Sequence, residues 1–291
     1  MLAAITVDET TGQTAYLNYF PDEDVGSTYT FGGATLDPAL ASWDNPDRDS
    51  GGVWEEEGTG VWTYTFGKAV PADYDASLTH VLGLYADKDS RASISNILYA
   101  FVPDGSDVEQ TRLISETESC NRCHDPLSLH GGTRQEVTLC LLCHTPDSLD
   151  PESGNSVDMK IMIHKIHKGA ELHEVEEGGA YYIVGYRNSV HDYSHVEFPA
   201  DVRDCEICHT GPDGDNWKTQ PSRDACGSCH DNVDFETGEG HSDFEFPQPN
   251  DEKCSTCHSS EMVSEFDSSI PGVHMKDEES SLLTGVNFEV V

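Results

Sequence analysis

Cys120-Asn121-Arg122-Cys123-His124 is the first of five pentapeptides in which two cysteines, separated by two residues, are followed at once by histidine. Together the five account for all ten cysteines of the 291-residue chain. The other four, motifs 2 to 5, are Cys140-Leu141-Leu142-Cys143-His144, Cys205-Glu206-Ile207-Cys208-His209, Cys226-Gly227-Ser228-Cys229-His230 and Cys254-Ser255-Thr256-Cys257-His258. This is the attachment pattern of c-type haem, in which two thiols on one turn bind the porphyrin and the histidine is directed at the iron. The motifs predict five covalently attached haems.

Zinc is the competing interpretation, because two Cys-x-x-Cys pairs also form zinc ribbons. Zinc gives no reason for a histidine after every pair. The chain has 14 histidines, so five such placements by chance have a probability on the order of 10⁻⁷. Five pairs also leave one without a Cys₄ partner. A disulfide framework is disfavoured as well, since cysteines this close in sequence rarely staple a fold of this size.

The charge and apolar content exclude other classes. The chain has 16 basic and 54 acidic residues, a formal net charge of −38, which excludes nucleic acid as a partner. Hydrophobic residues make up 36%, and no run approaches the roughly 18 apolar residues of a membrane-spanning helix. Such thin apolar content in the cysteine-rich part leads us to expect that the haems themselves form much of its core.

The cysteines mark a domain boundary, because residues 1–110 contain none and only one histidine, His80. We predict an N-terminal antiparallel β-sandwich or split barrel over 1–110, a mostly irregular, helix-poor pentahaem domain over 111–279, and the start of a truncated further β segment over 280–291. One helix, Val157–Leu172, has clear periodicity. The expected strands, rich in β-branched and aromatic residues, are 14–20, 28–31, 61–66, 80–85, 94–102 and 286–291.

Five haems need five further axial ligands, and histidine suits low-potential electron transfer better than methionine. Nine histidines lie outside the motifs. His164 and His167 are three residues apart on the expected helix, so they project towards two neighbouring irons. Small residues beside a histidine allow close approach to a ring face and favour His130, His241 and His274. The alternates are His191 and His195, and the histidines not expected to bind iron are His80 and His173.

These residues resemble the outer-membrane decahaem c-type cytochromes of the OmcA/MtrC family. The resemblance covers Cys120 to Gly132, the helix around His164 and His167, the run 185–194, and Phe198-Pro199 leading to Cys205. It implies two β domains alternating with two pentahaem domains, with bis-histidine haems arranged as a crossed wire. The chain matches only the first β domain and the first pentahaem domain of that arrangement. The resemblance also implies that the distal ligands are His130, His164, His167, His241 and His274.

The resemblance further implies an exported protein at the outer-membrane surface or outside the cell. There it would pass electrons by haem-to-haem hopping from a donor cytochrome and a porin–cytochrome complex to ferric minerals, metal chelates or flavins. We expect an electron-transfer protein, with no more enzymatic activity than non-specific metal reduction. Two alternatives remain: a multihaem reductase with one open iron, and a filament in which protomers self-associate and exchange a distal histidine.

Overall fold

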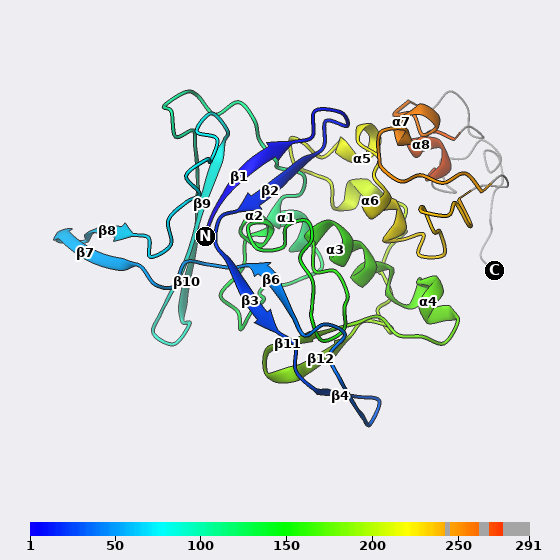
Figure 1. Ribbon diagram of the computed structural model, residues 1–291, viewed down its shortest axis with the longest axis horizontal. Coiled ribbons are helices and arrows are strands. Elements are labelled where there is room, and N and C mark those ends of the chain that lie inside the picture. Colours follow the sequence, from blue (N-terminus) through cyan, green and yellow to red (C-terminus); the bar gives the residue numbers. More distant parts are fainter. Residues whose placement is uncertain (242–244, 262–267, 276–291) are drawn as a thin grey trace, which may run out of the picture.

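The computed structural model describes residues 1–241, 245–261 and 268–275. Its main sheet is antiparallel and has four strands in the order β10-β9-β1-β2 (Figure 1). The strands are β1 (Leu2–Val7), β2 (Thr14–Asn18), β9 (His80–Lys88) and β10 (Ser93–Phe101). β1 is a continuous apolar run because both of its faces are covered. Ala3 and Ile5 pack into one core cluster, whereas Leu2 and Ala4 pack into another.

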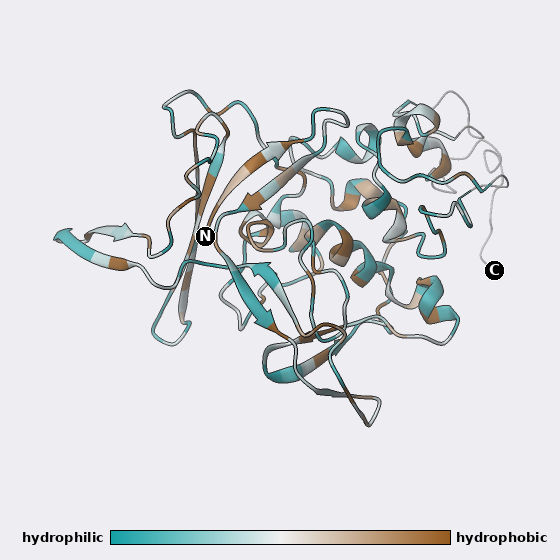
Figure 2. Cartoon of the chain, in the orientation of Figure 1, coloured by the Kyte–Doolittle hydropathy of each residue, from teal (hydrophilic) through white to brown (hydrophobic). Residues whose placement is uncertain are grey.

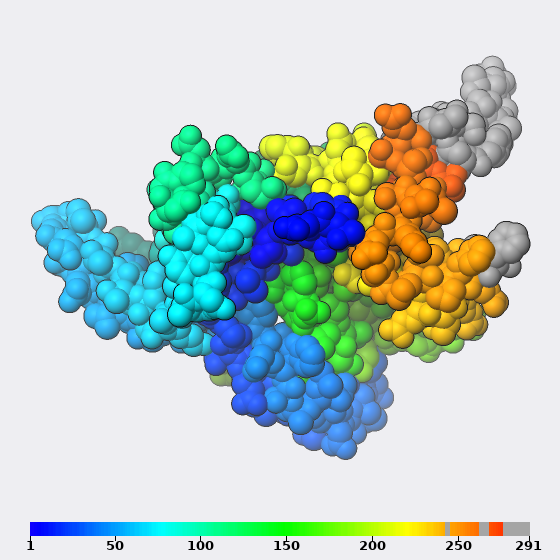
Figure 3. Space-filling model, turned by 45° about the horizontal axis from the view of Figure 1, so that its top comes forward, coloured from blue at the N-terminus to red at the C-terminus, as the bar shows by residue number. Residues whose placement is uncertain are grey.

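The remaining strands of the N-terminal region form two-stranded ribbons, and among the described residues they do not close into a barrel. The β7–β8 hairpin projects from the body (Figures 1 and 3), and β3 and β7 are strongly hydrophilic (Figure 2). The bounds are β3 (Pro21–Val25) with β6 (Ser42–Pro46), β4 (Tyr29–Phe31) with β5 (Ala34–Leu36), and β7 (Val53–Gly58) with β8 (Val61–Thr65).

The core beneath the main sheet includes a helix that carries a cysteine motif. α2 (Val137–Leu141) contributes Leu139, and Leu142 follows it; both are buried against Ala3 and Val81. Gly83 on β9 permits this approach, since a Cβ there would meet the side chains of both leucines. The sheet therefore positions motif 2 directly.

The rest of the chain consists of short helices joined by irregular segments, with one hairpin, β11 (Tyr182–Gly185) and β12 (Ser189–Asp192). An antiparallel β region followed by a helix-poor region confirms the predicted fold class. The other helices are α1 (Thr117–Cys120), α3 (Met159–Lys168), η1 (Gly169–Glu171), α4 (His173–Glu176), η2 (Tyr186–Asn188), η3 (Cys205–Ile207), α5 (Asn216–Thr219), α6 (Arg223–Gly227), α7 (Cys254–Cys257) and α8 (Ile270–Val273).

The longest described helix, α3, is shorter than the predicted 157–172. The side chain of Asp158 caps its N-terminus by accepting a hydrogen bond from the Lys160 backbone. Gly169 ends it with a φ of 44°, and a Cβ at that position would meet Val196. The predicted strand over 286–291 lies outside the described residues.

None of the described helices combines the length and the apolar character that crossing a membrane requires.

Candidate haem sites

Each cysteine motif adopts one helical turn. In all five, the backbone N–H of the histidine donates to the carbonyl of the first cysteine at 2.9 Å. This i to i−4 geometry places the two thiols on neighbouring positions of one turn. All ten cysteines lie in the described residues and none is in a disulfide. The thiols are therefore available to bond to one planar group at each motif.

Each motif histidine faces one histidine from outside the motifs. The distances between ring centroids are nearly equal in the five pairs, although the angles between the ring planes differ. The pairs are His124–His167 (6.3 Å, 76°), His144–His130 (5.8 Å, 32°), His209–His164 (6.3 Å, 15°), His230–His274 (6.3 Å, 63°) and His258–His241 (6.2 Å, 48°).

This spacing fits a metal held between two imidazoles. With metal–nitrogen bonds of about 2 Å on either side, two imidazole rings have their centroids about 6 Å apart. Direct ring contact or a shared hydrogen bond would place them nearer. The donor set at each pair, two imidazoles beside two thiols, is what a c-type haem with two histidine ligands requires. The residues present therefore fit this group at all five motifs.

Contacts at Nδ1 fix the orientation of most of these imidazole rings. A metal bound at Nε2 leaves the proton on Nδ1, which then needs an acceptor. In seven of the ten histidines, Nδ1 lies 2.6–3.2 Å from a backbone carbonyl oxygen. These are His144 with Val157, His164 with Lys160, His167 with Ile163, His209 with Gly214, His241 with Phe246, His258 with Ser268 and His274 with Ile270.

Burial keeps several of these imidazoles neutral at pH 7. Burial, followed by the charge of His209, lowers the pKa of His164 to about 4. Burial likewise lowers the pKa of His144, His167 and His209. The neutral ring is the form that binds a metal, so these environments favour ligation over protonation.

α3 supplies histidines to two different motifs. His164 faces His209 of motif 3 and His167 faces His124 of motif 1. The lysines of the same helix make ion pairs with acidic residues on other segments; for example, Lys160 lies 3.1 Å from Asp224 of α6. α3 is thus held in place by ion pairs while its histidines face two motifs.

The remaining histidines have other surroundings. His80 is 1% exposed and is a core residue, with Nε2 2.9 Å from the Tyr19 hydroxyl and Nδ1 2.9 Å from the Leu78 carbonyl. His191 lies on β12, 3.2 Å from the Ser189 hydroxyl. His173, the first residue of α4, and His195 are both exposed and are not part of the five pairs.

Motifs 2, 1 and 3 are neighbours in space. Burial, and then the charge of Cys120 in motif 1, raise the pKa of Cys140 in motif 2 to about 11. Burial and the same Cys120 also raise the pKa of Cys208 in motif 3. Motif 1 is therefore next to both. In agreement, Thr117 of α1 donates to Glu136 beside α2 at 2.7 Å, and Ser119 of α1 donates to the carbonyl of Cys208 at 3.4 Å.

The series continues through motifs 4 and 5. Burial, and then Cys229 of motif 4, raise the pKa of Cys205 in motif 3 to about 11. The pKa of Cys254 in motif 5 is raised by burial, then by the charge of Asp251, and then by Cys226 of motif 4. The motifs thus follow one another in the order 2, 1, 3, 4, 5, which Figure 1 shows as a progression from α2 and α1 through α6 to α7.

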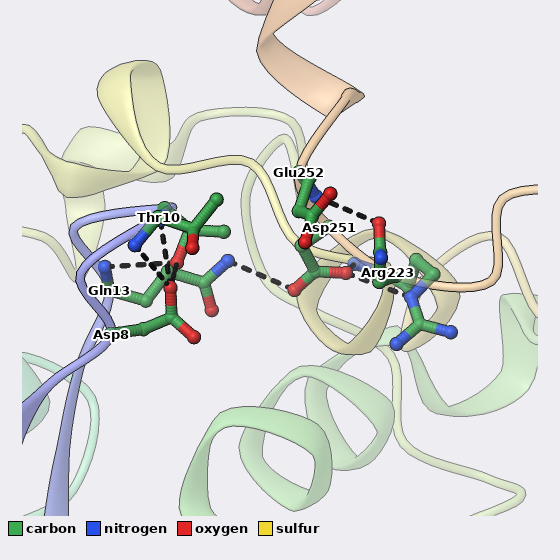
Figure 4. A pocket seen from close by; sticks show the side chains of 8 residues that line it. Asp8, Thr10, Gln13, Arg223, Asp251 and Glu252 are labelled. Carbon is green, nitrogen blue, oxygen red and sulfur yellow. Dashed lines mark hydrogen bonds and ion pairs between the residues drawn. The ribbon is translucent and has the colours of Figure 1, made fainter.

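The β1–β2 hairpin also reaches motifs 4 and 5, at a pocket of about 220 Å³ (Figure 4). The amide of Gln13 donates to Asp251 at 2.9 Å, and Arg223 Nε donates to the same carboxylate at 2.8 Å. Burial raises the pKa of Asp251, but the hydrogen bonds from Gln13 and Arg223 outweigh it and leave that pKa lowered. Asp251 therefore ties the hairpin to α6, which contains the first cysteine of motif 4.

Sequence reasoning missed one residue beside this set. The side chain of Asn216 lies 3.1 Å from Nδ1 of His209. Its signal in the sequence is its place seven residues after the motif histidine, beyond Gly211 and Gly214. A histidine that binds a metal through Nε2 commonly has a hydrogen-bond partner at Nδ1, and a polar residue shortly after the motif is a candidate for it.

Comparisons with known proteins identify relatives of this chain. A family model described as outer membrane cytochrome MtrC/MtrF-like, domains II/IV, matches residues 112–269. The multiheme cytochrome MtrC of Shewanella baltica (strain OS185) is 28% identical over 231 residues, which cover 74% of this chain and 30% of that protein.

Two crystal structures are similar. The outer membrane decaheme cytochrome OmcA has a TM-score of 0.72 and 26% identity, covering 94% of this chain and 42% of that one. MtrC from Shewanella baltica OS185 has a TM-score of 0.58 and 24% identity, covering 91% and 38%, and supports the fold alone. The chain spans about a third of the curated relative's length and less than half of either solved chain.

Proposed function

Because this chain belongs to the MtrC/MtrF-like family of outer-membrane cytochromes, we propose that it is an electron conduit with five covalently attached haems. The observation that carries the proposal is the set of five histidine pairs, each with one motif histidine and a centroid spacing of 5.8–6.3 Å. When bound, each haem supplies a one-electron Fe(III)/Fe(II) couple. The protein attaches, ligates and orients it.

Ligation from both sides favours electron transfer over bond chemistry, because it leaves the iron no open coordination position. The cysteines of the five motifs would hold the haems covalently. The motif histidines His124, His144, His209, His230 and His258 would each supply one nitrogen ligand to the iron. The histidines that face them would supply the second, and these are His167, His130, His164, His274 and His241, in the same order.

The order of the motifs gives the conduit a direction along the molecule. Motifs 2, 1, 3, 4 and 5 are successive neighbours. Thr117 of α1 donates to Glu136 beside α2 at 2.7 Å, and Ser119 of α1 donates to the carbonyl of Cys208 in motif 3 at 3.4 Å. The thiol of Cys229 in motif 4 is near enough to Cys205 to affect its pKa, and Arg223 of α6 donates to Asp251, just before motif 5. With haems bound, electrons would hop between neighbouring motifs, and motifs 2 and 5 would be the two ends. Motif 2 packs beneath the β sheet, whereas motif 5 lies beyond the tip of the β1–β2 hairpin (Figure 1).

The acidic character of the chain affects the reduction potentials of the haems. A net charge of −38 stabilises the more positive ferric state and lowers the reduction potentials. Salt screens this effect beyond about 10 Å at 0.1 M. Low potentials suit delivery to external acceptors, for which we propose ferric minerals, metal chelates or flavins. We propose a donor cytochrome and an outer-membrane porin complex as partners, at the cell surface.

Haem stoichiometry and ligand exclusion test this function together. The protein is expressed with the c-type haem maturation machinery, its haem is counted as the pyridine haemochrome, and the reduced protein is exposed to CO. We expect five haems, no substantial CO binding and rapid oxidation of the reduced protein by a ferric chelate. Fewer than five haems, or CO binding to one of them, would contradict the conduit and favour the reductase alternative.

A further inference from the structure

His209 differs from the other motif histidines in the partners of its Nδ1 atom. Two acceptors lie 3.1 Å from it, the backbone carbonyl of Gly214 and Oδ1 of Asn216. In His144, His164, His167, His241, His258 and His274, the acceptor beside Nδ1 is a backbone carbonyl oxygen. Asn216 is therefore an Nδ1 partner that a side-chain substitution can change.

The loop that leads to Asn216, the first residue of α5, packs closely against its neighbours. Gly214 is buried, and a Cβ there would meet the carbonyl oxygen of His209 itself. A Cβ at Gly211 would meet the carbonyl oxygen of Leu113, on the segment that leads from the β region. The backbone N–H of Asp213 also donates to Leu113 at 3.0 Å. This closely packed loop places the start of α5, and with it the Asn216 amide, beside His209.

We propose that Asn216 is a positioning residue that orients His209 and lowers the reduction potential of the haem at motif 3. This inference rests on the proposed function, because it concerns a ligand of one of the five haems. Nδ1 of a metal-bound imidazole carries the proton, so the oxygen of the Asn216 amide, rather than its nitrogen, faces the ring.

The direction of the effect follows from ligand basicity. An acceptor at Nδ1–H increases the electron density that the imidazole donates through Nε2. A stronger donor stabilises ferric over ferrous iron and lowers the potential. Two acceptors also restrict rotation of the ring, in accord with the 15° angle between the planes of His209 and His164. Loss of Asn216 therefore changes both the potential and the angle.

The test compares two substitutions with a control on the same helix. Asn216→Leu keeps the approximate size and removes the acceptor, whereas Asn216→Asp keeps the shape and makes the acceptor anionic. Thr219→Val, on the exposed side of α5, leaves the His209 contact intact. All three are prepared as holoproteins, their haems are counted, and the five potentials are resolved by spectroelectrochemistry alongside electron paramagnetic resonance.

We expect Asn216→Leu to raise one of the five potentials and Asn216→Asp to lower one. A tenfold change in the equilibrium between ferric and ferrous iron corresponds to a shift of about 59 mV in the potential. We expect a shift of this order when His209 loses the hydrogen-bond acceptor that Asn216 supplies at Nδ1. The low-spin signal of that site should change in both variants, and Thr219→Val should match the wild type.

Unchanged potentials in either Asn216 variant with five haems would overturn the role of Asn216. If Asn216→Leu loses a haem, the isosteric Asn216→Asp decides: a lowered potential supports the proposal and unaltered potentials refute it. Fewer than five haems in the wild type would instead contradict the proposed function, since that count is made on the protein with Asn216 in place.

Discussion

Replacing His164 by alanine removes one proposed axial ligand with little change to the helix that carries it. Alanine is the strongest helix former, so α3 should persist. The substitution removes the ring that faces His209 at a centroid distance of 6.3 Å, together with its Nδ1 contact to Lys160. One haem of five then loses its sixth ligand, so about a fifth of the total haem should become five-coordinate and high-spin.

The assay is CO titration of the reduced holoprotein with parallel haem counting. His164→Ala should bind about one CO per chain, and its motif 3 potential should rise because a donor ligand is lost. Added imidazole should restore the low-spin spectrum, since the substitution leaves a space the size of the His164 ring opposite His209. His173→Ala, on exposed α4, is the matched control and should bind no more CO than the wild type. A five-haem His164→Ala protein with the wild-type spectrum would refute the assignment of His164.

Two further predictions concern stability. Asp251→Asn should lower the free energy of unfolding by about 1–2 kcal/mol at pH 7, because a partly buried, charge-assisted contact with Arg223 is lost. Since the pKa of Asp251 is lowered by folding, this contribution is present above the unfolded pKa of about 3.9 and disappears as the pH falls through the folded value. Urea titrations at pH 7 and pH 3 test this, and an equal difference at both would contradict it. His80→Leu should cost about 1–3 kcal/mol by leaving the Tyr19 hydroxyl without its buried partner. Its haem count and visible spectrum should match the wild type, and a lost haem would be the contrary result.

The chemistry of the sites could be predicted because it is local in sequence. Each Cys-x-x-Cys-His motif spans five residues, and the spacing of His164 and His167 on one helix is visible without tertiary information. The sequence does not show which motif histidine faces His164 and which faces His167. His167 faces His124, 43 positions earlier, whereas His164 faces His209, which is later in the chain. Such crossing pairs depend on how α3 packs between segments distant in sequence.

The strands that sequence patterns missed have tertiary causes. Leu2–Val7 lacks alternation because both faces of β1 are buried. Pro21–Val25 has acidic residues at its three central positions and is exposed along its length, and it is a strand because it pairs with Ser42–Pro46. Asn216 was missed for a related reason, since its role depends on a turn that brings it back to His209.

Electron paramagnetic resonance of the fully oxidised protein, with haem counting, tests the central claim most directly. Each imidazole donates into the iron d orbital perpendicular to its own plane. Near-parallel planes therefore separate the d-orbital energies, and near-perpendicular planes leave them close. The pairs at 15° and 76° should thus give distinct low-spin signals. The account predicts five low-spin haems of at least these two kinds. A stoichiometric high-spin signal, or a colourless protein, would contradict it.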